Sequence, residues 1–451
     1  MRRTLFTIIA VVATIMAATA QSPFAGWWRG QLAMLPIVFH IEETAPGNLS
    51  GNLYSPAQTA EPIPLTTVRA HTDTLTVEVA GIGLRYTGTI SGTPRKIDGT
   101  LTQGGNKFSI ALLPATEDDA KVYRPQTPQP PFLYNSDDIT FRNGTLTLAG
   151  TLTYPWSGTP AGAVVLVSGS GAHNRDEEIM GHKPFAVIAD FLTHCGWAVL
   201  RYDDRGCGGS DAGSPHDTTL DFATDALAAL RYLRGLDMLR HRPIGILGHS
   251  EGGAIAMIDA ATHPAEVDFI ISLAGPALKG SDIMVRQNEM IAELSGTPVT
   301  PAHRDSLRQA FTLLADTTIS TQQLEPRLMS LLSDIVTDPD HRLASIQQTS
   351  TPWYRAFMAY DPAPYLKEIR CPMLALNGLW DVQVDAEPNL NAIHQAVPHA
   401  KVIAYPALNH LFQESASRRQ SFQYGSISQT ISPTVLNDIA DFLLTIPAPT
   451  R

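Results

Sequence analysis

Cysteine is scarce in this chain of 451 residues, which has three, at Cys195, Cys207 and Cys371. Three cysteines are too few for a disulfide framework, and at least one of them must stay unpaired. We therefore expect mainly free thiols, with a Cys195–Cys207 bridge as the alternative. The spacings C-x-x-C and H-E-x-x-H are also absent, so the sequence predicts no metal site.

Positive charge is also in short supply. Lys and Arg total 32 against 43 Asp and Glu, and the formal net charge is -11. A protein that binds nucleic acid or an acidic membrane surface concentrates positive charge, so we expect no nucleic-acid partner and no basic membrane-binding surface. Hydrophobic residues make up 44% of the chain, which is enough for a sizeable core, and the length suggests two domains.

Long apolar runs are missing, because beyond residue 20 no segment approaches the roughly 20 apolar residues of a membrane-spanning helix. The first twenty residues combine Arg2 and Arg3 with an apolar stretch from Leu5 to Met16 and the small residues Ala18-Thr19-Ala20. This order is typical of a cleavable secretory signal over residues 1–20 and predicts a periplasmic or extracellular protein. The alternative, a membrane anchor, would need a longer apolar run.

Residues 21–118 have the pattern of an all-β domain. Apolar and polar residues alternate, as in half-buried strands, at Leu35–Glu42, Leu75–Val79 and Phe108–Leu113. Glycine, proline and asparagine mark turns between these segments. Several short strands at this spacing predict a small barrel-like domain. Trp27 and Trp28 near its start are interpreted as packing residues, with ligand contacts as the alternative.

A proline-rich linker, residues 119–132, separates this domain from a second one over residues 133–451. The second domain opens with a predicted β-hairpin that turns at Asn143-Gly144. Buried strands then alternate with helices, which predicts an α/β domain whose mostly parallel sheet is covered on both faces. Its strands are predicted at 163–168, 197–202, 243–247, 269–274, 373–377 and 401–405.

The alternation is interrupted over about residues 280–367, where no convincing strand occurs. Helical periodicity is visible at Ile283–Leu294, Pro301–Asp316 and Gln322–Ile335. An insertion at the edge where strands end would cover a site there as a lid; the alternative is a peripheral decoration. Near its end, Trp353 and Tyr354 are candidate substrate contacts, and packing is their alternative role.

The most informative stretch is Gly248-His249-Ser250-Glu251-Gly252, which matches G-x-S-x-G. An apolar strand precedes it and an alanine-rich segment suited to a helix follows it. That context belongs to a sharp strand-to-helix turn that presents a serine hydroxyl at its tip. Glycines flank the serine because side chains there would collide with neighbouring elements. We predict a nucleophilic Ser250; the alternative is an ordinary glycine-rich turn.

A nucleophilic serine needs a base beside it, usually a histidine that a buried carboxylate orients. When the elbow carries the serine, the acid and then the histidine follow later strands. Asp381 comes after the predicted strand at 373–377 and is our candidate acid. Asp385 is the rival, but it lies farther from the end of the strand.

The candidate base is His410, which follows the last predicted strand at 401–405. Its alternative role is that of a surface-loop histidine. His394 and His399 are rivals, but both precede that strand and would lie at its opposite end. The sequence therefore predicts a triad of Ser250, Asp381 and His410.

The oxyanion of a tetrahedral intermediate needs two N–H donors. The backbone of Glu251, next to the nucleophile, should supply one of them. The other should come from the glycine-rich turn Ser168-Gly-Ser-Gly171, with Ser170 as the candidate and Gly171 as its alternative. The same turn resembles a phosphate-binding loop, but it lacks the Lys-Ser/Thr that would follow.

Charged residues follow two of the predicted strands. Arg175-Asp176-Glu177 comes after the glycine-rich turn, and Asp203-Asp204-Arg205 comes after the next strand. Charges near the carboxyl ends of strands could bind a charged substrate group, which makes Arg175, Asp176 and Glu177 candidate substrate contacts. The alternative, which we favour, is a network of ion pairs that shapes the loops. His249 is interpreted as a packing or orienting residue.

Taken together, these motifs resemble bacterial α/β-hydrolases of the serine aminopeptidase-like group, and most closely its secreted esterase branch. The resemblance covers about residues 133–447, and the segment before it looks like the N-terminal domain that often precedes such hydrolases in Bacteroidetes. It rests on the stretches 168–171, 175–177, 200–206, 248–253, 381–384 and 409–410.

The resemblance implies the α/β-hydrolase fold, the triad Ser250, Asp381 and His410, and carboxylester hydrolysis without a cofactor. One departure is visible, because Asn174 stands where the branch usually has Asp. The expected substrates are small-molecule esters with short acyl chains. Two alternatives stay open, namely a peptidase that acts on short peptides, in which Asp176 or Glu177 would hold the α-amino group, and a non-catalytic binding protein.

Overall fold

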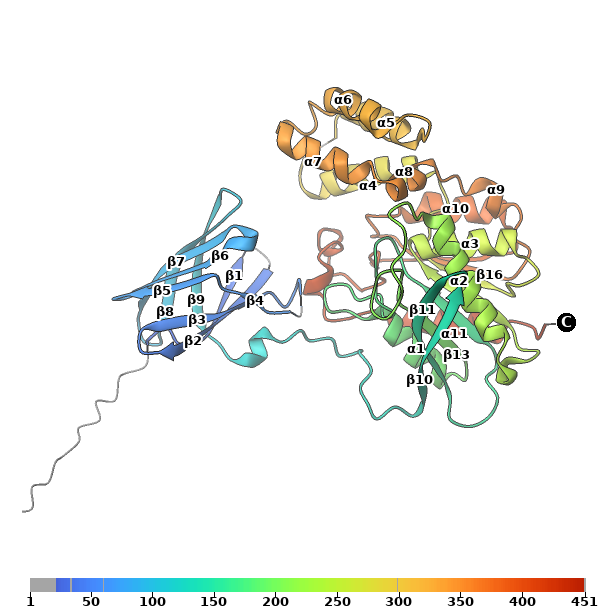
Figure 1. Cartoon of the computed structure of the whole chain (residues 1–451), viewed down its shortest axis with the longest axis horizontal. Coiled ribbons are helices and arrows are strands. Elements are labelled where there is room, and N and C mark those ends of the chain that lie inside the picture. The colour runs from blue at the N-terminus through green and yellow to red at the C-terminus, as the bar shows by residue number, and fades with distance from the viewer. Residues whose placement is uncertain (1–21, 33–34, 60, 298, 450–451) are drawn as a thin grey trace, which may run out of the picture. The chain divides into compact units, whose positions relative to one another are not determined.

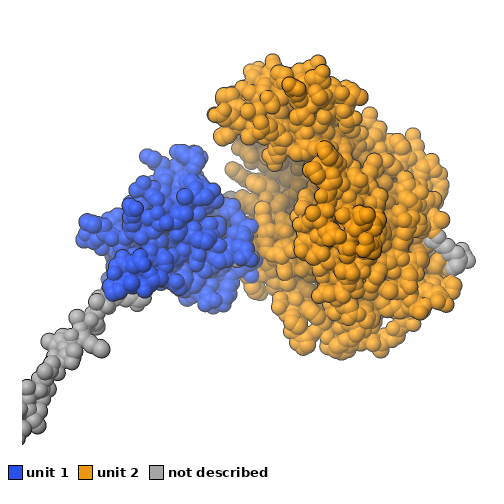
Figure 2. Space-filling model, in the orientation of Figure 1, with its two compact units in different colours: residues 1–122 blue, residues 123–451 orange. Residues whose placement is uncertain are grey.

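The computed structural model describes residues 22–32, 35–59, 61–297 and 299–449 (Figure 1). The predicted secretory signal lies outside these residues. The chain forms two compact units that divide between Val122 and Tyr123, coloured separately in Figure 2. Among the described residues, every helix is too short or too polar to cross a membrane.

The first unit is built on one nine-stranded antiparallel sheet in the order β4-β3-β2-β1-β9-β8-β7-β6-β5. Its elements are β1 (Gly26–Leu32), β2 (Leu35–Ala45), β3 (Asn48–Tyr54), β4 (Ile63–Pro64), β5 (Thr67–His71), β6 (Thr74–Val79), η1 (Ala80–Ile82), β7 (Leu84–Ser91), β8 (Lys96–Gln103), β9 (Asn106–Pro114) and η2 (Glu117–Ala120).

This sheet curls into a half-barrel. Its two edge strands, β4 and β5, are joined by Leu65 and Thr66 alone, so the edges must approach each other. Trp28 points into the core, where its indole N–H donates to the carbonyl oxygen of Phe24 at 2.8 Å. Trp27 lies on the opposite face and stacks on His40 with a ring distance of 3.9 Å. The predicted all-β, barrel-like domain is confirmed.

The second unit contains an eight-stranded sheet in the order β10-β11-β13-β12-β14-β15-β16-β17. Strand β11 is antiparallel to both of its neighbours, β10 and β13, and the six strands from β13 to β17 in this order run parallel to one another. The strands are β10 (Tyr134–Asn143), β11 (Leu146–Pro155), β12 (Ala163–Val167), β13 (Ala198–Tyr202), β14 (Ile244–His249), β15 (Ile270–Leu273), β16 (Met373–Gly378) and β17 (Lys401–Tyr405).

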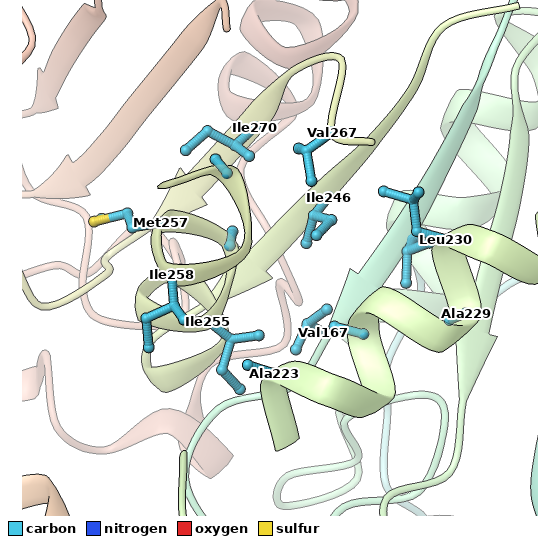
Figure 3. Close-up of a cluster of buried hydrophobic side chains, with 14 of the residues drawn as sticks. Val167, Ala223, Ala229, Leu230, Ile246, Ile255, Met257, Ile258, Val267 and Ile270 are labelled. Carbon is cyan, nitrogen blue, oxygen red and sulfur yellow. The ribbon is translucent and has the colours of Figure 1, made fainter. Parts of the chain in front are cut away.

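Helices cover both faces of this sheet. Along β12, Val165 belongs to the core under helices α2 and α3, whereas Val164 and Leu166 belong to the core under α1 and α11. Figure 3 shows part of the first core, in which α2 and α3 bring Leu230 and Ile255 against the strands. The covering helices are α1 (Pro184–His194), α2 (Thr219–Arg234), α3 (Glu251–Thr262), α9 (Ala363–Leu366), α10 (Ala386–Ala396) and α11 (Pro433–Leu444), and three 3-10 turns are η3 (Asp237–Leu239), η4 (Arg418–Gln420) and η5 (Tyr424–Ser426).

The strand order fixes where a site can form. From β12 the chain first goes to its neighbour β13 and then returns to β14 on the other side of β12. The connection after β12 leads to β13 and the connection after β14 leads to β15, in opposite directions, so a crevice opens at the carboxyl ends of β12 and β14. The glycine-rich turn follows β12 and the serine elbow follows β14, which places both predicted motifs at this crevice.

Between β15 and β16 the chain inserts a helical subdomain with its own core, drawn in yellow to orange in Figure 1. Its helices are α4 (Gly280–Leu294), α5 (Pro301–Ala315), α6 (Thr321–Leu331), α7 (Pro339–Thr349) and α8 (Pro352–Ala359). The predicted helix Gln322–Ile335 ends earlier, at Leu331, and residues 332–335 form turns, in which the hydroxyl of Ser333 donates to the carbonyl oxygen of Ser330 at 2.9 Å. The sequence missed α7, which buries only Ile346 and lacks an apolar period.

Phe269 offers a test of how the second core is held together. It is fully buried and makes edge-to-face contacts with Trp197 and Phe442, at ring distances of 5.7 and 6.4 Å. We expect Phe269→Ala to lower the free energy of unfolding by about 3–5 kcal/mol, because nothing fills the cavity it leaves. Urea unfolding measures the change. Phe422→Ala, at a ring that is 41% exposed, is the control and should shift stability by less than about 0.5 kcal/mol.

Candidate active site

Ser250 occupies a strained turn between β14 and α3. Its backbone angles are φ 52° and ψ −118°, a combination that side chains avoid and that sharp nucleophile turns adopt. The turn is held because the Ser250 amide donates to the carbonyl oxygen of Leu273 at 2.8 Å. Ser250 therefore stands at the tip of the turn, directly before the first residue of α3.

Two glycines make this turn possible. A Cβ at Gly248 would lie 1.9 Å from the carbonyl oxygen of Gly252, and a Cβ at Gly252 would lie 2.1 Å from that of Val167. Both contacts are with backbone, which has no room to withdraw. The chain therefore needs glycine on each side of Ser250 to bring α3 against the end of β12.

His410 and Asp381 form a buried hydrogen-bonded pair. The Nδ1 atom of His410 lies 2.7 Å from Oδ2 of Asp381, and the two residues are 3% and 2% exposed. The other oxygen of Asp381 accepts from the amides of Gln383 and Val384 at 2.7 and 3.0 Å. The carboxylate is fixed from both sides, and it in turn fixes the orientation of the imidazole.

Close backbone packing brings the loops of these two residues together. A Cβ at Gly378, the last residue of β16, would lie 2.2 Å from the carbonyl oxygen of Leu408. The loop after β17 is also braced by buried Asn409, whose side-chain oxygen accepts from the amides of Leu411 and Gln413. The acid and the base thus meet although 29 positions separate them in the chain.

The rival residues from the sequence lie elsewhere. Asp385 forms an ion pair with Arg286 of α4, with the Nε atom of Arg286 2.7 Å from its Oδ2 atom. His399 is exposed and contacts the carbonyl oxygen of Cys371 at 3.1 Å. His394 is exposed at the end of α10. None of the three reaches the Asp381–His410 pair through a contact among the described residues.

The loop after β12 lies against Ser250. A Cβ at Gly169 would be 3.1 Å from the Cβ atom of Ser250. The amide of Gly169 is already used, because it donates to Oε1 of Glu177 at 2.7 Å. The amide of Ser170 is next along the loop. Glu251 is the first residue of α3, so its amide N–H has no acceptor within the helix. The loop and the helix start thus put two candidate donors on either side of the serine.

A cavity of about 140 Å³ adjoins the elbow. Its walls include Gly169 and Glu251, the neighbours of Ser250 in space and in sequence. Trp353 of α8 closes it from the insertion, and its indole N–H donates to Oε1 of Glu251 at 2.9 Å. Of the two candidate contacts from the insertion, Trp353 lines the cavity, whereas Tyr354 packs in the core of the insertion. The remaining wall is mostly apolar, with Tyr202, Phe222 and Ile255.

Two carboxyl groups face this cavity without a cationic partner in the described residues. Asp204 accepts from the hydroxyl of Ser168 at 2.8 Å and from the amide of His173 at 2.9 Å. Burial raises the pKa of Asp204 to about 7. Burial also raises the pKa of Glu251, whose carboxyl accepts from the hydroxyl of Thr219 at 2.5 Å and also has the side chain of Ser170 as a partner. The sequence drew attention to the charge of Asp204 and to the backbone of Glu251, but it could not show that both carboxyls share one cavity.

The three candidate substrate contacts after the glycine-rich turn are bound to other side chains. Arg175 forms a bidentate pair with Asp203, with an Nη2–Oδ2 distance of 2.8 Å. Asp176 is paired with Arg201 of β13. Glu177 is fully buried and accepts from the ring of His249 at 2.8 Å. The cavity lining among the described residues does not include any of the three. Their contacts are those of a network that shapes the loops.

The predictions from the sequence also concern the cysteines and the potential metal ligands. All three cysteines are free thiols. Within the described part of the chain, we find no group of three or more His, Cys, Asp or Glu side chains placed to hold a metal ion.

Comparison with known proteins gives the family. Residues 162–417, more than half of the 451, match the sequence model of the alpha/beta hydrolase fold family. The chain belongs to this family. The predicted α/β-hydrolase fold with a helical insertion, preceded by an all-β domain, is therefore confirmed. The order of serine, acid and histidine after β14, β16 and β17 is the order of the nucleophile elbow and its partners in such hydrolases.

Individual relatives of this α/β hydrolase are distant. The chain is 26% identical over 322 residues to "Esterase EstD" of Thermotoga maritima. The alignment covers 70% of this chain and 68% of that protein. Among solved structures, the esterase Est1E of Butyrivibrio proteoclasticus, with ferulic acid bound, is 17% identical, covers 68% of this chain and 98% of its own, and has a TM-score of 0.42. Proline iminopeptidase of Mycobacterium smegmatis has the same identity, coverages and TM-score.

The packing of α3 on β12 in this hydrolase can be tested at Gly252. We expect Gly252→Ala to lower the free energy of unfolding by about 1–3 kcal/mol, because the new methyl group overlaps backbone atoms. Chemical denaturation measures the loss. Gly81→Ala is the matched control, since a Cβ at Gly81 meets nothing within 4 Å. Equal stability of the two variants would show that α3 does not lie this close to the strand.

Proposed function

We propose that this α/β hydrolase is a serine carboxylesterase that acts through an acyl-enzyme on Ser250. The observation that carries the proposal is the buried Asp381–His410 pair, together with a serine on a strained elbow whose neighbour His249 contacts the backbone of His410. Acyl transfer needs this set of groups, namely a nucleophile, a base and an acid that orients the base. The similarity to a protein named as an esterase supports an ester, rather than another acyl compound, as substrate.

In the first half of the proposed reaction, His410 takes the proton of Ser250 as the serine oxygen attacks the ester carbonyl carbon. His410 then gives this proton to the departing alcohol, and the acyl group stays on Ser250. In the second half, His410 takes a proton from water, the hydroxide attacks the acyl carbon, and the proton returns to Ser250 as the acid leaves. Asp381 holds the Nδ1–H of His410 and stabilises the imidazolium that forms in each half.

The negative charge on the carbonyl oxygen would be held by the amides of Glu251 and Ser170. Fixed N–H donors that face a developing oxyanion lower the barrier because they need no reorganisation as the charge forms. The amide of Gly169 is committed to Glu177, which keeps the loop in place and leaves the next amide for the substrate. No cofactor enters this scheme.

The proposed acyl site is the cavity next to the elbow. Its volume of about 140 Å³ is small, as pockets for drug-sized ligands usually measure about 300–1,000 Å³. Its largely apolar wall suits an acyl chain, and the indole of Trp353 limits the length of that chain. These features favour small-molecule esters with short acyl groups.

The contacts of Asp176 and Glu177 argue against the peptidase alternative. Asp176 and Glu177 would have to hold the α-amino group of a peptide, but both carboxylates are engaged by Arg201 and His249. We therefore keep membership of the secreted esterase branch of the serine aminopeptidase-like group as part of the proposal.

We also propose that the protein is exported after cleavage of its secretory signal. Sequencing the N-terminus of the secreted protein would test this, and we expect it to begin at Gln21.

The first test is hydrolysis of p-nitrophenyl esters from acetate to laurate, with an aminoacyl-p-nitroanilide series beside it. We expect turnover of the short esters and a loss of at least about 10⁴-fold in kcat for Ser250→Ala and for Asp381→Asn, the size of effect that triad substitutions produce. Asp385→Asn is the control for Asp381, because it changes a neighbouring acid that pairs with Arg286 instead.

Each other outcome has a defined meaning. Cleavage of the anilides alone would replace the esterase by a peptidase. Failure of Ser250 to react with a fluorophosphonate probe, in protein with a cooperative unfolding transition, would contradict a nucleophilic serine and favour the binding protein.

Trp353 tests the acyl site. We expect Trp353→Ala to raise the ratio of kcat/KM for octanoate to that for acetate by about 10-fold or more, because the indole no longer closes the cavity and each added methylene that fits contributes to binding. Trp156→Ala, at an indole that is 61% exposed, is the control and should leave the ratio unchanged. An unchanged ratio in Trp353→Ala would place the acyl chain elsewhere.

A further inference from the structure

His249 and Glu177 form a buried pair next to the serine, and the proposed reaction does not use it. Glu177 is 1% exposed and His249 is 5% exposed. The Nδ1 atom of His249 lies 2.8 Å from Oε1 of Glu177, and its Nε2 atom lies 3.0 Å from the carbonyl oxygen of His410. The rings of His249 and His410 are 4.8 Å apart.

The partners of the two ring nitrogens identify the protonation state of His249. A backbone carbonyl can only accept, so Nε2 must carry a proton. An ionised carboxylate also only accepts, so Nδ1 carries a proton as well when Glu177 is ionised. An imidazole with both nitrogens protonated is a cation. The geometry is that of a buried imidazolium between a carboxylate and a carbonyl dipole.

Electrostatics agrees with this assignment. Burial opposes charge on both groups, but the negative charge and hydrogen bond of Glu177 outweigh it and leave the pKa of His249 raised above its usual 6.5. In the same way, the charge and hydrogen bond of His249 leave the pKa of Glu177 lowered from 4.5 in spite of its burial. Each charge therefore favours the charged form of the other group.

The pair connects three loops that carry the proposed chemistry. Oε1 of Glu177 accepts from the amide of Gly169 as well as from His249, and so holds the loop that carries Ser170. His249 is the residue before Ser250, and it donates to the backbone of His410 itself. Glu177 adopts φ +49°, a conformation uncommon for this residue type, to reach this position.

We propose that Glu177 and His249 are positioning residues, an ion pair that sets the oxyanion loop, the elbow and the loop of His410 in register. The proposal rests on the proposed function, because register matters only if these loops share a reaction. Removing the charge of Glu177 would leave Nδ1 of His249 without its anion. His249 would then become neutral, and the ionic attraction that ties the three loops together would be lost.

Other ionisable groups also face the pair. Asp381 acts on His249 and favours its charged form, and His173 acts on Glu177 in the same sense. The ring of His410 lies against the ring of His249, and the negative charge of Glu177 contributes to the raised pKa of Asp204. These groups modify the titration, but only Glu177 makes a direct ionic contact with His249 among the described residues.

The pH dependence follows from the two shifts. The pKa of His249 is raised, so its contribution is complete below pH 6.5 and is lost as the pH rises through the folded-state value. The pKa of Glu177 is lowered, so its contribution is complete above pH 4.5 and is lost only as the pH falls through its folded-state value. We therefore expect kcat to decline at alkaline pH as His249 deprotonates.

The protonation state can be measured without activity. In wild-type protein labelled with ¹⁵N-histidine, we expect the His249 ring to show two protonated nitrogens at pH 7, assigned by comparison with His249→Gln. A neutral ring at pH 7 would overturn the proposal, whether or not the protein hydrolyses esters. Failure of the ester assay with a doubly protonated His249 would instead count against the proposed function alone.

The positioning role is tested with Glu177→Gln, whose amide oxygen can still accept but carries no charge. We expect kcat to fall by about 10–100-fold, the usual effect of losing a residue that orients catalytic groups, with little change in KM. The alkaline limb of the pH profile should move to lower pH. Glu177→Asp, which keeps the charge, should recover part of the activity.

Glu178→Gln is the matched control, since it removes an adjacent carboxylate that pairs with Lys183 at 3.5 Å. It should leave kcat and the pH profile unchanged. If Glu177→Gln lowers the melting temperature but keeps the wild-type kcat and alkaline limb, the pair is structural only and the proposal fails. If Glu177→Gln does not fold, Glu177→Asp and the wild-type spectrum still decide.

Discussion

The site depends on one close contact between backbones, where the first turn of α3 meets the carboxyl end of β12. With 2.1 Å between a Cβ at Gly252 and the oxygen of Val167, no larger residue fits. This approach forces the strained backbone of Ser250 and lays the loop after β12 beside it, 3.1 Å from a Cβ at Gly169. The cores on both faces of the sheet offset the energy of this strain, because they fix β12, β14 and α3 independently of the turn.

The charges around this contact are mostly neutralised within the loops themselves. Pairs such as Arg175–Asp203 and Glu177–His249 join segments that are distant in the sequence. A buried charge without a partner would be strongly destabilising, so each pair fixes the relative position of its two segments. Asp204 differs, since within the described part of the chain it accepts only from a hydroxyl and an amide, and burial raises its pKa to about 7. The cavity wall thus contains this carboxyl beside the ion pair of Arg205 and Asp225.

Among its described residues, the helical insertion lines the cavity through Trp353. Trp353 reaches Glu251 with its indole N–H, and so links α8 to the residue after the nucleophile. The rest of the insertion packs on its own core of Leu307, Phe311 and Leu328. An insertion with a separate core can change its contacts at the cavity without disturbing the sheet, which is why α/β hydrolases can vary specificity on a constant framework.

The sequence by itself determined the fold class and the chemistry-bearing motifs, because alternation of apolar residues, glycine punctuation and the order of Ser250, Asp381 and His410 are local or ordinal features. The sequence also favoured Asp381 over Asp385 as the candidate acid. The ion pair between Asp385 and Arg286 is consistent with that preference. Tertiary structure decided the rest. That Glu177 meets His249, or that Asp204 and Glu251 face one cavity, depends on how loops from β12, β13 and β14 converge at the strand ends. No pattern in the chain encodes such contacts between distant side chains, because they follow from strand order and close packing.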